Sequence, residues 1–366
     1  MQIEPKNSQE QTSNFDILSK EVKEGIEGKN NSIPIGFSRL NKHIGIRKRI
    51  YTTIIGATGS GKSALLHNAY ILNPFDWYIK EGEKLGTKLK IILFSMERSR
   101  IYTIAKWVSR KIFLDQGVLI PVSKLLGWWE TKLTHEEHDL FLMYEDYIDR
   151  LDEIVTIIEG PNNPTGYYKT VKEYAQKNGT IEEISEFNKI YIPNNPNEIV
   201  IPITDHLGIT KLEKGLDTKK MAIDKLSEYN RIFRDFYGYS PIAVSQLNRD
   251  LSNPIYQKQT SFEPTIDSAK ETGSVAEDSD VVISLFDPLR YKTNDSIYDA
   301  NKFVDTTNGS KCFRSVKVLK NSYGEDDLRV GMAFQGATGI FKELPKPKDM
   351  ENFNYESVFN NSYFLK

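Results

Sequence analysis

The chain has 366 residues, of which 39% are hydrophobic, and a formal net charge of −2. No apolar run approaches the ~20 residues of a membrane-spanning helix, and the polar N-terminus lacks the apolar core of a secretion signal. The single cysteine, Cys312, excludes an internal disulfide framework and a cysteine-rich zinc site, which is compatible with a reducing cytoplasm. Together these features lead us to expect a cytoplasmic protein with no membrane partner.

The first 32 residues are predicted to form an N-terminal arm with one short helix. Residues 1–14 are polar, whereas residues 15–28 carry apolar side chains roughly on one side of a helix. An isolated helix of this length has little to bury itself against. The pattern leaves two alternatives open: the helix docks on another surface, or it is frayed and solvated.

From residue 33 onwards, apolar strand-like runs alternate with helical patterns. The β-branched run 50–55 leads into a glycine-rich turn, and residues 63–72 follow with helical spacing. Residues 313–320 and 328–334 indicate a β-hairpin. The remaining predicted strands are 91–96, 152–158, 199–204, 240–246 and 279–286, and the remaining helical regions are 99–150 and 219–238. This alternation favours an α/β fold with a mostly parallel sheet that is covered by helices on both faces.

Two polar stretches interrupt the main domain, which we place at residues 33–343. Residues 167–197 indicate either an αβ insertion or a helix followed by a loop, and residues 293–311 indicate a polar surface loop. The tail, residues 344–366, is irregular but carries several aromatic side chains. We expect the tail to pack on the surface or against a neighbour.

The glycine-rich turn, GATGSGKS, fits the pattern G-x-x-x-x-G-K-[ST] of a phosphate-binding loop. Its glycines allow backbone N–H groups to close around phosphate oxygens, and the helix that follows contributes its positive N-terminal end. We predict that Lys62 neutralises the β- and γ-phosphates of ATP and that the Ser63 hydroxyl binds Mg²⁺. The strand before the loop and the helix after it favour this interpretation over a flexible turn. The loop comprises Gly56, Ala57, Thr58, Gly59, Ser60, Gly61, Lys62 and Ser63.

Three polar residues each follow a separate apolar strand, at the edge where open α/β sheets bind ligands. Asp205 suits a Mg²⁺-binding role, Glu97 suits a base that orients the attacking water, and the neutral amide of Gln246 suits a sensor of the γ-phosphate. Simpler alternatives remain open at two positions. Asp205 and its neighbour could cap a turn, and Glu97 could pair on the surface with Arg98 or Arg100.

Together these motifs resemble the ATPase domain of DnaB-type replicative helicases, which has a RecA-like P-loop fold. The matching stretches are GATGSGKS, FSMERS, ITDHLGI, VSQLNRDL and DSAKETGSVAEDSDVVISLF followed by VLKNSYGEDD. They follow the family's order across roughly residues 33–343, and VSQLNR and the E-x-G-x-x-x-x-D-x-D pattern that starts at Glu271 are the most specific. The Asn-, Lys- and Tyr-rich composition and the compact form are similar to phage members, which would act in the host cytoplasm.

The resemblance implies roles for individual residues. Glu97 would be the catalytic glutamate, Asp205 would hold Mg²⁺ directly or through water, and Gln246 would link the nucleotide site to a loop that faces DNA. Arg249, in the same motif as Gln246, would contact phosphate or a neighbouring subunit. Lys320, at the hairpin, matches the lysine of the family's last motif and would contribute to nucleotide binding.

The resemblance also implies an assembly. Family members form six-membered rings with ATP between subunits, translocate along single-stranded DNA in the central channel during replication, and contact a primase or a loader. Loops that correspond to residues 208–218 and 249–268 line that channel. Their basic residues suit phosphate tracking, although ordinary solvated charge is the simpler interpretation of each one. These residues are Lys211, Lys214, Arg249 and Lys258.

Two features depart from the family pattern. Lys320 matches the Lys-x-Arg motif, but Ser322 occupies the position of the arginine that reaches a neighbouring ATP site. Since such an arginine can raise the rate by several orders of magnitude, one of three explanations applies: Arg314, Lys317 or Arg329 replaces it, hydrolysis is slow, or a partner supplies it. In addition, only about 32 residues precede the core, where the helicases carry a helical domain.

The leading hypothesis is therefore an ATP-driven hexameric DNA helicase. The first alternative is a RecA-like ATPase without unwinding activity, acting in recombination, loading or assembly, and Ser322 and the short N-terminal region favour it. The second is a non-enzymatic scaffold whose nucleotide only stabilises a ring. The presence of Glu97 argues against the scaffold, because a degenerate ATPase would be expected to lose its base.

Overall fold

The computed structural model describes residues 13–28, 32–160, 162–185, 188–247, 263–266, 268, 273–295 and 297–365. The chain divides into two compact units, Met1–Ile33 and Pro34–Lys366. Among the described residues, no helix is long and apolar enough to cross a membrane.

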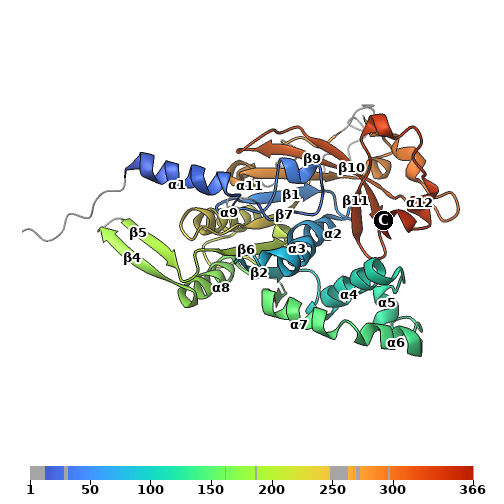
Figure 1. Ribbon diagram of the computed structural model, residues 1–366, viewed down its shortest axis with the longest axis horizontal. Coiled ribbons are helices and arrows are strands. Elements are labelled where there is room, and N and C mark those ends of the chain that lie inside the picture. Colours follow the sequence, from blue (N-terminus) through green and yellow to red (C-terminus); the bar gives the residue numbers. More distant parts are fainter. Residues whose placement is uncertain are drawn as a thin grey trace, which may run out of the picture. The chain divides into compact units, whose positions relative to one another are not determined.

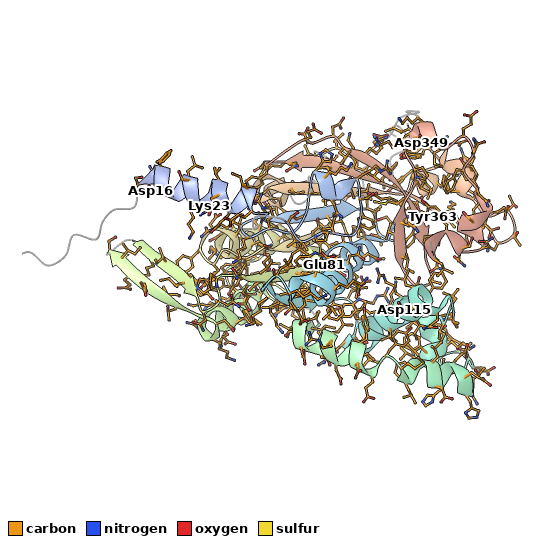
Figure 2. All side chains as sticks on the ribbon, viewed as in Figure 1. Asp16, Lys23, Glu81, Asp115, Asp349 and Tyr363 are labelled. Carbon is orange, nitrogen blue, oxygen red and sulfur yellow. The ribbon has the colours of Figure 1, made fainter. Side chains whose placement is uncertain are left out.

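Helix α1 (Asn14–Ile26) lies in the first unit. A capping box fixes its first turn, because the Ser13 hydroxyl accepts from the Asp16 amide while the Asp16 carboxylate accepts from the Ser13 amide. Asp16 in the first turn and Lys23 in the last turn complement the helix dipole (Figure 2). Four of the side chains expected on its apolar side are more than half exposed: Phe15, Leu18, Val22 and Ile26.

The second unit is built on one large sheet (Figure 1). Among the described residues, nine strands form it in the order β11-β10-β9-β8-β1-β7-β6-β2-β3. The strands from β8 to β3 pair in parallel, and β9, β10 and β11 extend the sheet as antiparallel strands. The predicted α/β fold with a mostly parallel sheet and a C-terminal hairpin is therefore confirmed. The bounds are β1 (Thr52–Gly56), β2 (Lys88–Ser95), β3 (Val155–Glu159), β6 (Glu198–Asp205), β7 (Ile242–Gln246), β8 (Val281–Phe286), β9 (Phe313–Asn321), β10 (Arg329–Gln335) and β11 (Ile340–Glu343).

Helices cover both faces of the sheet, as continuous apolar strands require. On one face, α8 (Pro164–Lys177), α9 (Lys219–Asp235) and α11 (Gly273–Asp278) share a core cluster with Phe94 of β2 and Ala243 of β7. On the other face lies α2 (Lys62–His67), which continues through a π-helical turn (Asn68–Leu72) into α3 (Asn73–Trp77). Leu65 of α2 lines a small cavity with Ile283 of β8, whereas the adjacent Val282 belongs to the cluster that includes Ala276 of α11.

The predicted helical region 99–150 forms a group of four helices (Figure 1). Helix α4 (Arg100–Gln116) begins at the Ser99 cap and ends at Gly117, whose φ of +70° is readily adopted by glycine. The others are α5 (Val122–Leu125), α6 (His135–Leu142) and α7 (Glu145–Ile154). They pack around Val108, Ile112, Ile120 and Tyr144. Because α7 extends to Ile154, β3 begins at Val155 rather than at the expected residue 152.

The two polar insertions differ in character. Residues 167–197 follow the αβ alternative: α8 leads into a hairpin of β4 (Gly179–Ser185) and β5 (Asn188–Pro193). The expectation of a polar surface loop at 293–311 is wrong in part, since Tyr298, Ala300 and Phe303 are buried. These residues lie on the same core cluster as Phe313 and Leu289, so the segment is a structural part of the domain.

The C-terminal tail packs on its own domain. Helices α12 (Glu356–Phe359) and α13 (Ser362–Leu365) place Phe364 in a cluster with Phe113 of α4. The Tyr363 hydroxyl donates to the backbone carbonyl of Glu343 at 2.5 Å. Short helical turns complete the fold at Leu40–Lys42, Tyr78–Gly82, Leu207–Ile209, Pro288–Tyr291, Ala300–Phe303 and Pro347–Asp349.

Candidate functional site

Four neighbouring strands, β1, β7, β6 and β2, end at the same edge of the sheet. Gly56 at the end of β1 is level with Gln246 at the end of β7. Asp205 at the end of β6 is level with Ser95 at the end of β2, and Glu97 follows two residues later. Topology alone therefore gathers the phosphate-binding loop, Asp205, Gln246 and Glu97 at one edge, which is where parallel sheets bind ligands.

The glycine-rich loop between β1 and α2 is closed by hydrogen bonds to one carbonyl. The Lys62 ammonium donates to Ala57 O at 2.8 Å, and the Ser60 hydroxyl donates to the same oxygen at 2.8 Å. Gly59 and Gly61 have φ values of +75° and +101°, in the left-handed region that favours glycine. This backbone leaves the first amides of α2 at the mouth of the loop, as a phosphate site requires.

Lys62 and Asp205 are buried charges within this edge, each 7% exposed. Burial lowers the pKa of Lys62 to about 8, while the charges of Asp205 and Glu97 act in the opposite direction. Burial also raises the pKa of Asp205 to about 6, which the hydrogen bond from Ser63 opposes. Both charged forms are therefore poorly solvated, and phosphate beside Lys62 and a cation beside Asp205 would stabilise them.

Ser63 and Asp205 form the candidate Mg²⁺-binding pair. The Ser63 hydroxyl donates to Asp205 Oδ1 at 3.1 Å. Mg²⁺ typically takes one or two carboxylates together with hydroxyl, phosphate and water oxygens, so this pair suits an ion that is shared with a nucleotide. Within the described residues, no group of three His, Cys, Asp or Glu side chains could hold a metal ion alone.

Glu97 lies near this pair on the exposed side of the strand end. Its charge contributes to raising the pKa values of Lys62 and Asp205. The two arginines that could have paired with Glu97 have other contacts: Arg100 pairs with Asp152 at 2.9 Å, and Arg98 lies over the Tyr102 ring at 5.2 Å. This arrangement favours the water-orienting role over the surface ion pair.

Gln246 is coupled to the residue that follows Asp205. Its side-chain Nε2 lies 3.2 Å from His206 Nε2, and His206 Nδ1 accepts from the Gly208 amide at 3.1 Å. His206 therefore caps the turn Leu207–Ile209, while Asp205 instead contacts Ser63. The turn-capping alternative applies to His206 alone.

Three further side chains at the loop were not predicted from the sequence. A methyl group on Gly59 would lie 2.7 Å from the guanidinium of Arg290, and one on Gly61 would lie 3.2 Å and 3.3 Å from the rings of Phe341 and Phe334. Arg290 follows β8 closely, so the strand-end rule could have found it. The two phenylalanines come from β10 and β11, and no local signal marks them.

The hairpin cations are engaged within their own chain. The Lys320 ammonium donates to the carbonyls of Glu277 at 2.8 Å and Ala276 at 3.2 Å. In the sheet, Lys320 lies opposite Val282, at the end of β8 that is remote from the phosphate-binding loop. A role for Lys320 in nucleotide binding therefore stays a prediction that concerns a neighbouring subunit. The exposed Ser322 donates its amide to Asp280 O.

The three cations considered as substitutes for the missing arginine are also paired. Arg314 is buried, donates to Ser60 O at 2.8 Å and pairs with Asp287 at 3.3 Å. Lys317 pairs with Asp327, and Arg329 pairs with Glu263 and with Asp295. None of these three is free to reach a second subunit without losing an ion pair in its own chain.

The predicted DNA-facing loops are described only in part. In the loop 208–218, Lys211 and Lys214 are exposed. Arg249 and Lys258 lie outside the described residues, as does most of the loop 249–268 and the start of the motif at Glu271.

Comparison with known proteins identifies the fold. No family model matches the chain, and no curated protein matches it in sequence. Among solved structures, one described as an "ATPase Domain" matches with a TM-score of 0.63 and 19% identity over 91% of this chain and 99% of that one. "The Structure Of A DnaB-Like Replicative Helicase And Its Interactions With Primase" matches with the same score and identity over 91% of this chain and 67% of that one. The chain thus has the RecA-like fold of DnaB-type helicase ATPase domains.

Proposed function

We propose that the protein is an ATP-dependent DNA helicase or translocase of DnaB type that hydrolyses ATP to move on single-stranded DNA in replication. The observation that carries this proposal is the Ser63–Asp205 contact beside Lys62 and Glu97, at the carboxyl edge of a sheet with the DnaB-type fold. This set supplies a phosphate cradle, metal ligands and a base, which are the parts that P-loop ATP hydrolysis requires.

Each residue has a defined task in this proposal. The loop amides and Lys62 bind the phosphates. Lys62 donates to the neutral Ala57 carbonyl in this structure, and a charged phosphate oxygen would replace that carbonyl as its partner. Ser63 and Asp205 hold Mg²⁺, which supplies charge neutralisation at the β- and γ-phosphates. Arg290, above Gly59, adds a cation on the solvent side of the loop.

Glu97 orients and polarises the attacking water. It is exposed at the open side of the site, and its charge acts on both Lys62 and Asp205, which supports a place for it beside the γ-phosphate of a bound nucleotide. Gln246 contacts His206, next to the metal-binding carboxylate, and stands just before the loop 249–268. We assign to Gln246 the coupling between γ-phosphate loss and that loop.

The assembly follows from the same proposal. Subunits would form a hexameric ring with ATP at their interfaces, Lys211 and Lys214 would track DNA phosphates, and Arg249 and Lys320 would contact nucleotide or a neighbour. A primase or a loader is the proposed protein partner, because one of the matching structures is described together with its interactions with primase. The cytoplasm, of a host cell if the protein is phage-encoded, is the proposed location.

The first test is Glu97→Gln, which removes the base and keeps the shape of the side chain. We expect ATP binding to persist and hydrolysis to fall by ~100-fold or more, the range of a general base. Binding is measured by titration with a fluorescent ATP analogue, and turnover by phosphate release. Glu81→Gln is the matched control at an exposed position on another segment. Turnover of the Glu97 variant at the parent rate would contradict the assignment of the base.

The second test separates helicase from the alternative, a RecA-like ATPase that does not unwind. Ser322 favours this alternative, and so do the hairpin cations, because Lys320, Arg314, Lys317 and Arg329 all have partners within their own chain. Fork unwinding by an oligomer of verified mass supports the helicase, whereas DNA-stimulated ATP hydrolysis without unwinding supports the alternative. Nucleotide binding with no turnover would support a scaffold and contradict both.

A further inference from the structure

Asp205 faces a second side chain of α2 besides Ser63. Ser63 and His67 are four residues apart, so they lie on the same face of the helix. Asp205 Oδ1 accepts from the Ser63 hydroxyl at 3.1 Å, while Oδ2 lies 3.8 Å from His67 Nε2. One helix therefore faces both oxygens of the same carboxylate.

Trp107 of α4 determines which imidazole nitrogen carries the proton. Its indole Nε1 lies 3.2 Å from His67 Nδ1, and an indole N–H can only donate. Nδ1 must therefore accept, which leaves His67 neutral with its proton on Nε2, the nitrogen that faces Asp205. Trp107 is 2% exposed and meets the imidazole edge-on, with ring centroids 5.5 Å apart, so packing holds this orientation.

We infer that His67 is a positioning residue for Asp205: its Nε2–H orients Oδ2 so that Oδ1 stays turned toward Ser63 and the metal-binding side. This inference rests on the proposed function, since it concerns the carboxylate assigned to Mg²⁺. A separation of 3.8 Å is longer than a hydrogen bond. At this distance the Nε2–H attracts Oδ2 electrostatically, while Oδ1 keeps its hydrogen bond from Ser63.

A neutral donor is the suitable partner for a metal-binding carboxylate in a buried site. It orients the carboxylate as an outer-shell partner does, and it adds no positive charge that would repel Mg²⁺. Trp107 acts on Asp205 only through His67. Without the indole N–H, His67 could carry its proton on either nitrogen. The competing explanation is that Trp107 and His67 only pack α4 against α2.

Three variants separate positioning from packing. His67→Leu replaces the imidazole with an apolar side chain of similar bulk and so removes the donor, whereas His67→Gln restores an N–H at a similar reach. Trp107→Phe keeps a ring and removes the indole N–H, and it is the milder change if His67→Leu fails to fold. The matched controls are His138→Gln and Trp128→Phe, on other elements and more exposed than His67 and Trp107.

The readout is Mn²⁺ binding to the full chain saturated with ADP, measured from the paramagnetic resonance signal of free Mn²⁺. We expect His67→Leu to weaken Mn²⁺ affinity by ~10-fold or more, the range for losing an outer-shell partner, and Trp107→Phe to weaken it less. His67→Gln and both controls should bind Mn²⁺ within a few-fold of the parent. ADP affinity without divalent cations should be the same for all variants.

Each result decides the inference. Equal Mn²⁺ affinity in the parent and His67→Leu overturns it, and so does an equal loss in His67→Leu and His67→Gln, because only packing explains that pattern. A parent chain that binds Mn²⁺ with ADP but never hydrolyses ATP would contradict the proposed function, and the Mn²⁺ titration would still decide the role of His67. A parent chain that binds no ADP overturns both.

Discussion

Asp205 and Lys62 are buried charges whose partners in the nucleotide-free chain are weak. Lys62 donates to a neutral carbonyl, and Asp205 accepts from a neutral hydroxyl. Both charged forms are disfavoured by burial. The residues that would bind nucleotide and metal therefore destabilise the empty fold, as is common where a site is organised for a ligand.

Asp205→Asn should stabilise the nucleotide-free protein while removing Mg²⁺-dependent hydrolysis. The native pKa of Asp205 is raised from 3.8 to about 6, so the native state binds more protons than the unfolded state between these values. Parent stability therefore falls as pH rises through this window, by about 3 kcal/mol at most, and the neutral amide avoids that loss. We expect the variant to be more stable by about 1–3 kcal/mol above pH 7 and nearly equal to the parent below pH 4.

The measurement is denaturant unfolding at several pH values without nucleotide or divalent cation. Asp139→Asn, at an exposed position on α6, is the control and should leave the pH profile unchanged. A stability difference that does not vary with pH would show that Asp205 does not carry a raised pKa in the native state.

Residues at strand ends were predictable because an apolar run stops where the chain leaves the sheet. This rule places Glu97, Asp205 and Gln246 at one edge. The rule does not predict Trp107 or Phe334, because these residues come from α4 and β10 and contact the site through tertiary packing. Nothing in their local sequence distinguishes them from ordinary core residues.

At the scale of elements, the segment 293–311 shows where polar composition misleads. Its few apolar residues follow no helical or strand period, so the sequence indicates a solvated loop. In the fold, Phe303 is fully buried against Phe313 and Tyr355, and the Asp295 side chain, 1% exposed, faces Arg329 at 3.8 Å. These residues are buried partly by β10 and by the C-terminal tail, which lie outside the segment. A pattern confined to the segment therefore cannot predict their burial.

Phe303→Ala should therefore destabilise the domain by about 3–5 kcal/mol, the usual cost of removing a fully buried phenylalanine. If the segment were a surface loop, the substitution would change the free energy of unfolding by close to zero. Denaturant unfolding at pH 7 measures the difference, with the exposed Thr306→Ala in the same segment as the control. A change below about 1 kcal/mol in Phe303→Ala would mean that this segment is not packed as described.

At the scale of the whole molecule, the order of elements and the sheet were largely predictable, but the partners of the hairpin cations were not. The sequence shows Arg314, Lys317 and Arg329 near a turn that lacks the expected arginine. The fold shows that each of them already pairs with an acidic side chain: Lys317 with Asp327 in its own hairpin, and Arg314 and Arg329 with Asp287 and Glu263 from other segments. Any of these three cations that reached a neighbouring ATP site would have to give up an ion pair within its own chain.

Ser322→Arg tests whether this position faces a neighbouring ATP site. Ser322 is exposed and holds the hairpin turn through its backbone amide, so an arginine side chain can be added without breaking that contact. If subunits associate as proposed, we expect kcat for ATP to rise by ~10-fold or more, within the range that a trans-acting arginine provides. The increase should appear only at concentrations where oligomers dominate, because the arginine acts on the adjacent subunit.

The matched control for this gain of function is Ser322→Ala, which should leave kcat unchanged. An increase that is independent of protein concentration would place the arginine at its own chain's site, contrary to the topology of β8 and β9, where the hairpin turn lies at the opposite end of the strand from the phosphate-binding loop. No increase in a verified oligomer would mean that a different chain supplies the cation or that catalysis proceeds without one.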